Sequence, residues 1–386
     1  MFVVSIGAGK NQIPLIQSCK DLGFKVIGVD VNPHSEGLAL CDFKIIESIY
    51  NHHEIYDSIK ELLVFDDVAA IVTRSYGKAI QTVGYLCQQF KLPYIDNESL
   101  PILLNKSDFR AIATKNDILM PQGFVFKKKE IRKNFPLPFP CIVKPPKGHA
   151  KQYVQLVYNY NQLKEYLAPL KHDEIIIEQF ISGDEIIVIG FVYNTKFYIC
   201  DISDKVLSAK PYFVDRMHLL PSNYQSMSSQ FEELGQKIAD SFNLHSTPLL
   251  MECIISNNKI YLIEAACEFG GEFLADYAIP ARSDYNIFSS FILAITRGKI
   301  ITPLPSKNAS VVKYIFGRNG ILKSYNIPKK NNDCVYSKIF FTIGSKITFP
   351  KNNHHRLGVI VSKGKSIEKA LETADTVLED MKIIIE

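Results

Sequence analysis

Residues 262–273 read LIEAACEFGGEF, an apolar run that ends at Glu264 and is followed by Glu268 and paired glycines. The run before it, LLMECIISNNK at 249–259, carries Glu252. The segment SNNK between the two runs predicts a hairpin turn, and the two glutamates at near-symmetric positions about it should face each other across the strands. Facing carboxylates repel unless a cation lies between them. Mg²⁺ bound by one or two carboxylates plus substrate phosphates is typical of such a pair.

Outside this hairpin, the pattern of strands and helices changes along the chain. Residues 1–96 alternate apolar strands with helices, which predicts a parallel, doubly wound sheet. From 141 onward, strands follow one another in pairs, with 174–181 expected to pair with 185–203, which predicts a mostly antiparallel sheet with covering helices. We therefore expect a fold of mixed α/β and α+β class with four units, at 1–100, 101–175, 176–304 and 305–386.

Composition is ordinary for a globular protein. The net charge is +4 over 386 residues, and the one short basic run, KKKEIRK at 127–133, is typical of a solvated loop, so we expect no nucleic-acid partner. Eight scattered cysteines without a C-x-x-C pair indicate a reducing compartment. The apolar start is too short for a signal sequence, and no run reaches the length of a membrane span. We expect a cytoplasmic protein without a membrane partner.

Three further segments combine strand ends with polar groups. GAGKNQ at 7–12 has two glycines of a dinucleotide fingerprint, but Gln12 stands at the third position, so a tight strand-to-helix turn is favoured over nicotinamide binding. The segment 139–157 places Lys144 at a strand end and then a loop with Lys147, Gly148, His149 and Lys151. That loop suits a polyphosphate or is a surface hairpin. In EIIIEQFISGDE at 174–185, Glu178 and Glu185 could accept from adenine and ribose, or pair with a cross-strand lysine.

Taken in order, NKSDFR, VKP with its polar loop, EQFISGDE and MEC…IEAACEFGG resemble the ATP-grasp superfamily over nearly the whole chain. The tail HHRLGVIVSKGKSIEKALETA is similar to the carbamoyl-phosphate-synthase-like branch. EAA at 264–266 and PYFVDRMHLLPS at 211–222 resemble carboxylate–amine ligases, including L-amino acid ligases. The resemblance implies an ATP-grasp fold behind an N-terminal Rossmann-like domain.

The resemblance also implies roles for individual residues. Lys106, Lys144 and Lys151 would contact the phosphates of ATP, and Glu252 and Glu264 would ligate Mg²⁺, or Mn²⁺ in its place. Glu178 would meet the adenine amino group, with the backbone of Gln179, Phe180 and Ile181 along the ring, and Glu185 would hold the ribose. His218, Gly270 and Gly271 are candidates for substrate binding, and we also expect a homodimer.

Two positions depart from the pattern of the relatives. Many relatives have arginine where this chain has Glu268. Either another cation takes over (Arg216, Arg282 or Arg318), or the chemistry is altered, or Glu268 pairs with a cationic amine; we assign Glu268, Arg216 and Arg282 to the catalytic set on this basis. The phosphate loop carries His149, Gln152 and Tyr153 where relatives have small residues, which stiffens it.

These observations favour an ATP-dependent ligase. It would convert a small carboxylate into an acyl phosphate for attack by an amine, such as an amino acid, with ADP and phosphate as products. A nucleotide-binding homologue without ligase turnover, acting as a sensor or partner subunit, is the alternative. A bicarbonate-using carboxylase is less favoured, because the chain has no biotin-carrier or glutaminase segment.

Overall fold

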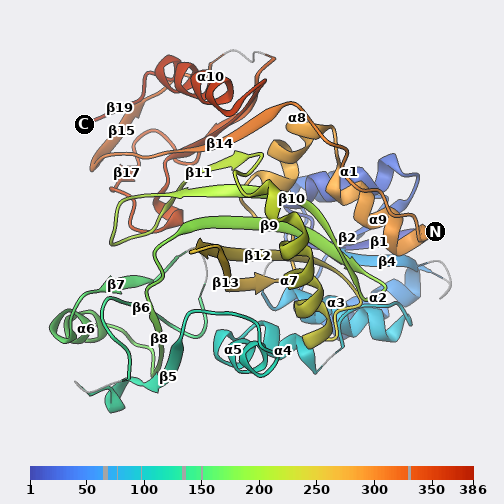
Figure 1. The fold of residues 1–386 in the computed structure, drawn as a ribbon. Coiled ribbons are helices and arrows are strands. Elements are labelled where there is room, and N and C mark those ends of the chain that lie inside the picture. Colours follow the sequence, from blue (N-terminus) through green and yellow to red (C-terminus); the bar gives the residue numbers. More distant parts are fainter. Residues whose placement is uncertain (64–67, 76, 97, 133–135, 149–150, 329–331) are drawn as a thin grey trace.

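The computed structural model describes residues 1–63, 68–75, 77–96, 98–132, 136–148, 151–328 and 332–386 (Figure 1). Within these residues the strands form a parallel sheet, a small antiparallel sheet, a large antiparallel sheet and a short three-stranded sheet. The α/β and α+β fold class predicted from the sequence is confirmed. Among the described helices, none has the length and apolar character that crossing a membrane requires.

The N-terminal sheet is parallel with the order β3-β2-β1-β4, as the alternation of strands and helices predicted. Its strands are nearly all apolar and buried, as expected when helices cover both faces. Gly7 turns the chain out of the first strand with a φ of +97°, a conformation that favours glycine. The bounds are β1 (Phe2–Ile6), β2 (Lys25–Val29), β3 (Phe43–Ile45), β4 (Val68–Thr73), α1 (Ile13–Asp21), α2 (His52–Leu62) and α3 (Ala79–Gln89).

The small sheet has the order β5-β8-β6-β7. The expected pairing of 174–181 with 185–203 is wrong, because β8 pairs antiparallel with β5 and β6 instead. Ile175, Ile176 and Ile177 are all buried, so the run has no alternation that could indicate its partner. The predicted boundary at 175/176 therefore divides this strand. The bounds are β5 (Gly123–Lys127), β6 (Cys141–Lys144), β7 (Gln155–Val157), β8 (Glu174–Gln179), α4 (Ser99–Leu103), α5 (Lys106–Lys115) and α6 (Tyr160–Leu167).

The large sheet runs through the middle of the molecule in the order β13-β12-β9-β10-β11-β14-β18-β16 (Figure 1). Its last strands come from the tail, so the predicted 305–386 unit shares this sheet with the 176–304 unit. Helix α7 packs on β10. The bounds are β9 (Asp184–Tyr193), β10 (Lys196–Leu207), β11 (Asp215–Leu220), β12 (Ser246–Ser256), β13 (Lys259–Ala266), β14 (Ala309–Ile315), β16 (Cys334–Ile339), β18 (Gly358–Gly364), α7 (Ser228–Ser241), α8 (Ile279–Ser283) and α9 (Ile287–Arg297).

The C-terminal end adds a short sheet of order β17-β15-β19 and a helix, α10, that packs on β18 and β14. Ser366 caps this helix by accepting from the backbone N–H of Lys369. One buried core joins the N-terminal unit to the large sheet, with α1 packed against α9. The bounds are β15 (Gly320–Ser324), β17 (Lys346–Ile347), β19 (Ile384–Ile385) and α10 (Ile367–Asp380).

Candidate active site

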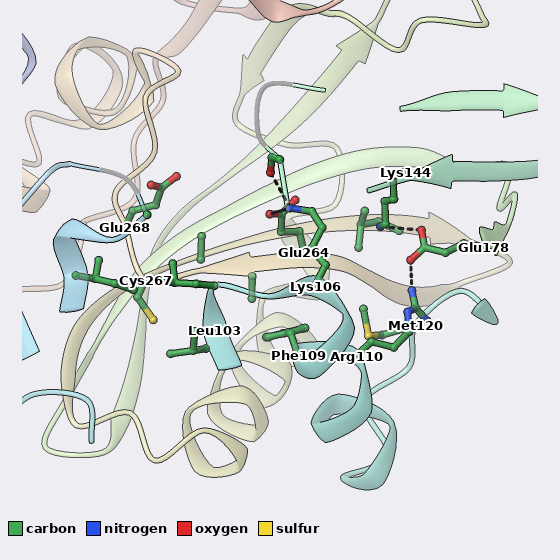
Figure 2. Close-up of a pocket in the computed structure, with 17 residues that line it drawn as sticks. Leu103, Lys106, Phe109, Arg110, Met120, Lys144, Glu178, Glu264, Cys267 and Glu268 are labelled. Carbon is green, nitrogen blue, oxygen red and sulfur yellow. Dashed lines mark hydrogen bonds and ion pairs between the residues drawn. The ribbon is translucent and has the colours of Figure 1, made fainter. Parts of the chain in front are cut away.

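A cavity of about 980 Å³ lies between the N-terminal, small and large sheets and the tail. Its wall brings together most of the residues that the sequence singled out, from segments more than a hundred residues apart. Figure 2 shows a smaller adjoining pocket, with Lys106 beside Glu264 and Lys144 beside Glu178. The predicted residues on the cavity wall are Lys106, Lys144, Lys151, Glu178, Gln179, Phe180, Ile181, Glu185, Glu252, Glu264, Glu268, Gly270 and Gly271.

The hairpin of β12 and β13 forms one wall of the cavity. Glu252 and Glu264 are direct partners in its register, so the predicted facing of the two glutamates is confirmed. Each carboxylate is neutralised by lysine. Lys106 Nζ lies 2.6 Å from Glu264 Oε1, and Lys205 Nζ lies 2.9 Å from Glu252 Oε2. Burial opposes ionisation of Glu252, but Lys205 and Lys151 outweigh it and lower the pKa of Glu252 to about 2.

Lys205, near the end of β10, is the centre of this charge network. Its side chain is fully buried, and its Nζ lies 3.3 Å from Asp215 Oδ1 as well as beside Glu252. Burial alone would lower the pKa of this ammonium group, but Asp215 and Glu252 raise it well above its ordinary value. Lys205 therefore stays charged in the folded protein, and it holds Glu252 ionised at the cavity wall.

Glu178, on β8, is clamped by two cations. Lys144 Nζ lies 2.7 Å from Glu178 Oε2, and the Arg110 guanidinium bonds the other oxygen. All three side chains are nearly buried, and Arg110 also donates to the carbonyl of Pro121 at 2.7 Å. The cross-strand lysine that the sequence left open for Glu178 is thus present on the neighbouring strand β6.

Glu268 follows the end of β13 and lines both the cavity and the smaller pocket. Its carboxyl is half-buried, and no hydrogen bond or ion pair reaches it from the residues that the structure describes. Burial, together with the negative charge of Glu264 and Glu272, raises the pKa of Glu268 to about 7, and the Arg74 guanidinium opposes this shift.

The turn after Glu268 requires glycine. Gly270 has a φ of +70°, and a Cβ there would lie 2.7 Å from the side chain of Leu250. The N-terminal unit fixes this turn through Arg74, which follows β4. Arg74 donates to the carbonyl of Gly270 at 3.1 Å and pairs with Asp276 Oδ1 at 2.6 Å.

The three arginines proposed as replacement cations do not line the cavity. Arg216 is exposed, with its guanidinium 5.7 Å from the ring centroid of Phe316. Arg282 is buried, where it pairs with Asp201 Oδ2 at 2.7 Å. The structure therefore does not place these two arginines where they would replace the missing cation. Arg318, the other candidate cation, bonds the carbonyl of Ile385 instead.

His218 is also outside the cavity lining. It is fully buried on β11, and its Nε2 lies 3.2 Å from Glu272 Oε2. Glu272 itself lines the cavity. Burial alone would raise the pKa of Glu272, but Lys205 and His218 hold it well below its ordinary value. His218 can thus act only through Glu272.

The predicted phosphate loop lies partly in the cavity wall. Pro145, Gly148, Lys151 and Gln152 line the cavity, whereas Tyr153 is exposed with a φ of +56°. His149 lies outside the described residues. Lys151 Nζ lies 3.3 Å from Glu185 Oε2 and 3.5 Å from Glu252 Oε2, which ties this loop to two predicted site residues.

Several residues of the cavity, and Arg110 of the smaller pocket, were missed by the sequence reasoning. Arg74 had a signal, because it directly follows a parallel strand and ligands of such sheets bind at that edge. Arg110 lies within the quoted segment NKSDFR. Lys205 and Arg356 gave no local signal, because their importance depends on contacts made across the large sheet and the tail.

Within the described part of the chain, the two hairpin glutamates could hold a metal ion only together with ligands from outside the protein. No group of three or more His, Cys, Asp or Glu side chains among the described residues could hold a metal ion by itself. Two facing carboxylates on a cavity wall instead suit Mg²⁺ that takes its other ligands from substrate phosphates and water.

Comparison with known proteins agrees with this geometry. Residues 137–276, which include both hairpin glutamates, match the ATP-grasp domain. The chain is 24% identical to the formate-dependent phosphoribosylglycinamide formyltransferase of Saccharolobus solfataricus, over 96% of this chain and 94% of the relative. It is 21% identical to the carbamoyl phosphate synthase large chain of Helicobacter pylori J99, over 64% of this chain but 23% of that longer protein.

Among solved structures, the L-amino acid ligase of Bacillus licheniformis aligns with a TM-score of 0.81 at 17% identity, covering all of this chain and 98% of that one. At this identity the likeness demonstrates a shared fold. The expected ATP-grasp fold is confirmed.

Proposed function

Because this chain contains an ATP-grasp domain and has the ATP-grasp fold, we propose that it is an ATP-dependent ligase that joins a small carboxylic acid to an amine, such as an amino acid. One observation carries the proposal. Glu252 and Glu264 face each other on the cavity wall, and the lysines that neutralise them come from three other segments of the chain. Such a network gathers charged side chains at one point of the cavity wall, and binding of MgATP at that point would explain why they are there.

The ion pairs indicate how ATP would be accommodated. Lys106 and Lys144 now pair with Glu264 and Glu178, and Lys151 pairs with Glu185. On binding, the phosphates of ATP would replace these glutamates as the partners of the three lysines. The ribose hydroxyls would then donate hydrogen bonds to Glu185. Both oxygens of Glu178 already accept from cations, so the adenine amino group would donate to the lone pairs of the Glu178 carboxylate that remain free. The backbone of 179–181 borders the same cavity.

Mg²⁺ would be held by Glu252 and Glu264, with Mn²⁺ as the alternative ion. Bound there, the metal would neutralise charge on the phosphoryl oxygens of ATP. Lys106 would pass from Glu264 to a phosphate as the metal and nucleotide bind.

The chemistry follows from this arrangement. A carboxylate oxygen of the acid attacks the γ-phosphorus of ATP, the bond from that phosphorus to the β–γ bridging oxygen breaks, and ADP leaves. The amine nitrogen then attacks the carbonyl carbon of the acyl phosphate. The bond from that carbon to the phosphate oxygen breaks, and the nitrogen loses a proton. Water must be excluded meanwhile, because an acyl phosphate hydrolyses.

ADP release tests the proposal. The protein with MgATP is screened against the twenty amino acids and a panel of small carboxylic acids, singly and in pairs. We expect ADP release that depends on one acid and one amine together, with a product mass equal to their sum less water. Release that is identical without any added acid would contradict the proposal.

The alternative is a nucleotide-binding homologue without turnover, and Glu268 is the observation that favours it. The resemblance places an arginine at this position beside the phosphoryl group, and a carboxylate there would oppose the stabilisation of negative charge that develops during transfer. ATP binding by calorimetry without ADP release for any acid or pair would favour this alternative.

A further inference from the structure

Glu268 presents a carboxylate to the cavity that no described residue neutralises directly. No hydrogen bond or ion pair is made to it within the described part of the chain, although it lines the cavity. The other glutamates named on this wall each lie beside a basic side chain: Lys144 for Glu178, Lys151 for Glu185, Lys205 for Glu252, Lys106 for Glu264 and the His218 imidazole for Glu272. Glu268 is thus an exception in a site built from matched charges.

Arg74 is the cation that lowers the pKa of Glu268, but its guanidinium already pairs with other groups. Its guanidinium pairs with Asp276 at 2.6 Å, donates to the carbonyl of Gly270 at 3.1 Å and donates to the carbonyl of Asn11 at 2.5 Å. Its side chain is only 4% exposed, so it has little freedom to turn toward Glu268. Arg74 holds the turn after Glu268 and leaves the carboxylate available to a ligand.

A spare donor of the opposite charge lies on the same wall. Arg356 lines the cavity, and its Nη1 is buried without a hydrogen-bond partner among the described residues. The guanidinium stacks on Tyr314, with Cζ 3.6 Å from the ring centroid, and the Tyr314 hydroxyl donates to the carbonyl of Glu272. The Tyr314 ring thus links Arg356 to Glu272, which follows Glu268 by four positions.

The cavity wall therefore carries a carboxylate that no described residue pairs with and a guanidinium whose Nη1 has no described hydrogen-bond partner, while its Nε donates to the carbonyl of Asn353 at 2.8 Å. Together the two groups complement a zwitterion. We propose that Glu268 binds the ammonium group of the amine substrate, and that this substrate is an α-amino acid whose carboxylate faces Arg356. This inference rests on the proposed ligase function. It assigns the inverted charge at position 268 to substrate recognition rather than to a lost activity.

Hydroxylamine separates this inference from the function on which it rests. It is uncharged near neutral pH and attacks an acyl phosphate to give a hydroxamate, so it reports carboxylate activation without an ammonium group. A hydroxamate screen with MgATP first identifies the acid that is activated. The twenty amino acids are then compared as acceptors for that acid, and the KM of the preferred one is measured beside that of hydroxylamine.

The variants are Glu268→Gln, which removes the charge, and Glu268→Asp, which keeps it. Glu232→Gln is the matched control, because Glu232 is exposed on α7 and does not line the cavity. We expect Glu268→Gln to raise the KM of the amino acid about 10- to 100-fold more than the KM of hydroxylamine. Glu268→Asp should keep the preference for amino acids, and it keeps the test open if Glu268→Gln does not fold.

Each outcome decides one point. Hydroxamate formation with equal changes in both KM values, or with no amino acid accepted, would overturn the inference while leaving the ligase function intact. Loss of Mg²⁺ dependence in Glu268→Gln, with no selective change in the KM of the amino acid, would make Glu268 a metal ligand and also overturn it. No hydroxamate and no ADP release from any acid would instead refute the proposed function.

Discussion

Replacing Glu178 by glutamine should destabilise the protein strongly, because two buried cations would lose their shared carboxylate. The side chains of Glu178 and Lys144 are 4% and 8% exposed, and that of Arg110 is 10% exposed. Removing one partner of a buried ion pair costs about 3–5 kcal/mol, most of it from the charge left without a partner. With an unfolding entropy of about 2.1 cal/mol/K per residue, each kcal/mol lowers the unfolding midpoint of a 386-residue chain by about 1 °C, so we expect a fall of roughly 4–6 °C.

The matched control is Glu174→Gln, the same chemical change on the same strand. Glu174 is exposed at the start of β8, so its replacement should move the midpoint by less than about 2 °C. Thermal unfolding followed by circular dichroism, without nucleotide, compares the two variants with the parent protein. Equal midpoints for Glu178→Gln and Glu174→Gln would refute the reasoning, since the Lys144–Glu178–Arg110 cluster would then contribute nothing.

Three further perturbations test the rest of the site. Glu252→Gln and Glu264→Gln should each lower kcat for MgATP-dependent ADP release by about 10²-fold or more, because each removes charge from the proposed metal site. In a Mg²⁺ titration, half-maximal activity should require more Mg²⁺ than in the parent protein. An unchanged titration would exclude the hairpin as the metal site. Glu268→Gln should raise the unfolding midpoint relative to the parent at pH 8 but not at pH 4.5. The pKa of Glu268 is raised from an ordinary 4.5 to about 7 by burial and its acidic neighbours, so the cost of ionising it in the folded state develops between these values; a difference that is constant with pH would contradict this. Arg74→Met should cost about 3–5 kcal/mol by leaving Asp276 buried and unpaired, whereas Arg132→Met, an exposed control, should leave the unfolding midpoint nearly unchanged; equal effects in urea unfolding would argue against the role of Arg74 at the turn.

The parts of this fold that the sequence predicted are those where local pattern determines structure. The turn at SNNK predicted that β12 pairs with β13 and that the two glutamates lie near each other. The register of the turn alone would set Glu252 opposite Ile263, and a β-bulge between Glu252 and Cys253 places it opposite Glu264 instead. The alternation of strands and helices likewise predicted the parallel N-terminal sheet. The motif order predicted the ATP-grasp fold for the same reason, since each motif is a strand end, a turn or a helix start.

The parts that could not be predicted depend on partners distant in sequence. The buried isoleucines of β8 would suit either sheet, so the sequence did not indicate that β5 and β6 flank it. Arg282 matched an expected cation by type alone. Its actual partner, Asp201, is 81 residues away on β10 and holds it outside the cavity wall. Lys205 was overlooked because a lysine inside a strand usually lies on its solvent face, whereas this one is buried among acids.

Transfer of oxygen from the acid to phosphate tests the central claim most directly. The carboxylate that supports ADP release would be labelled with ¹⁸O in both oxygens and incubated with MgATP, the amine and the protein in unlabelled water. Mass analysis of the inorganic phosphate should find one ¹⁸O atom per phosphate, because the bridging oxygen of an acyl phosphate stays with phosphorus when the amine displaces it. Unlabelled phosphate would mean that water, not the carboxylate, attacks ATP, and would contradict the assignment of this chain as a carboxylate–amine ligase.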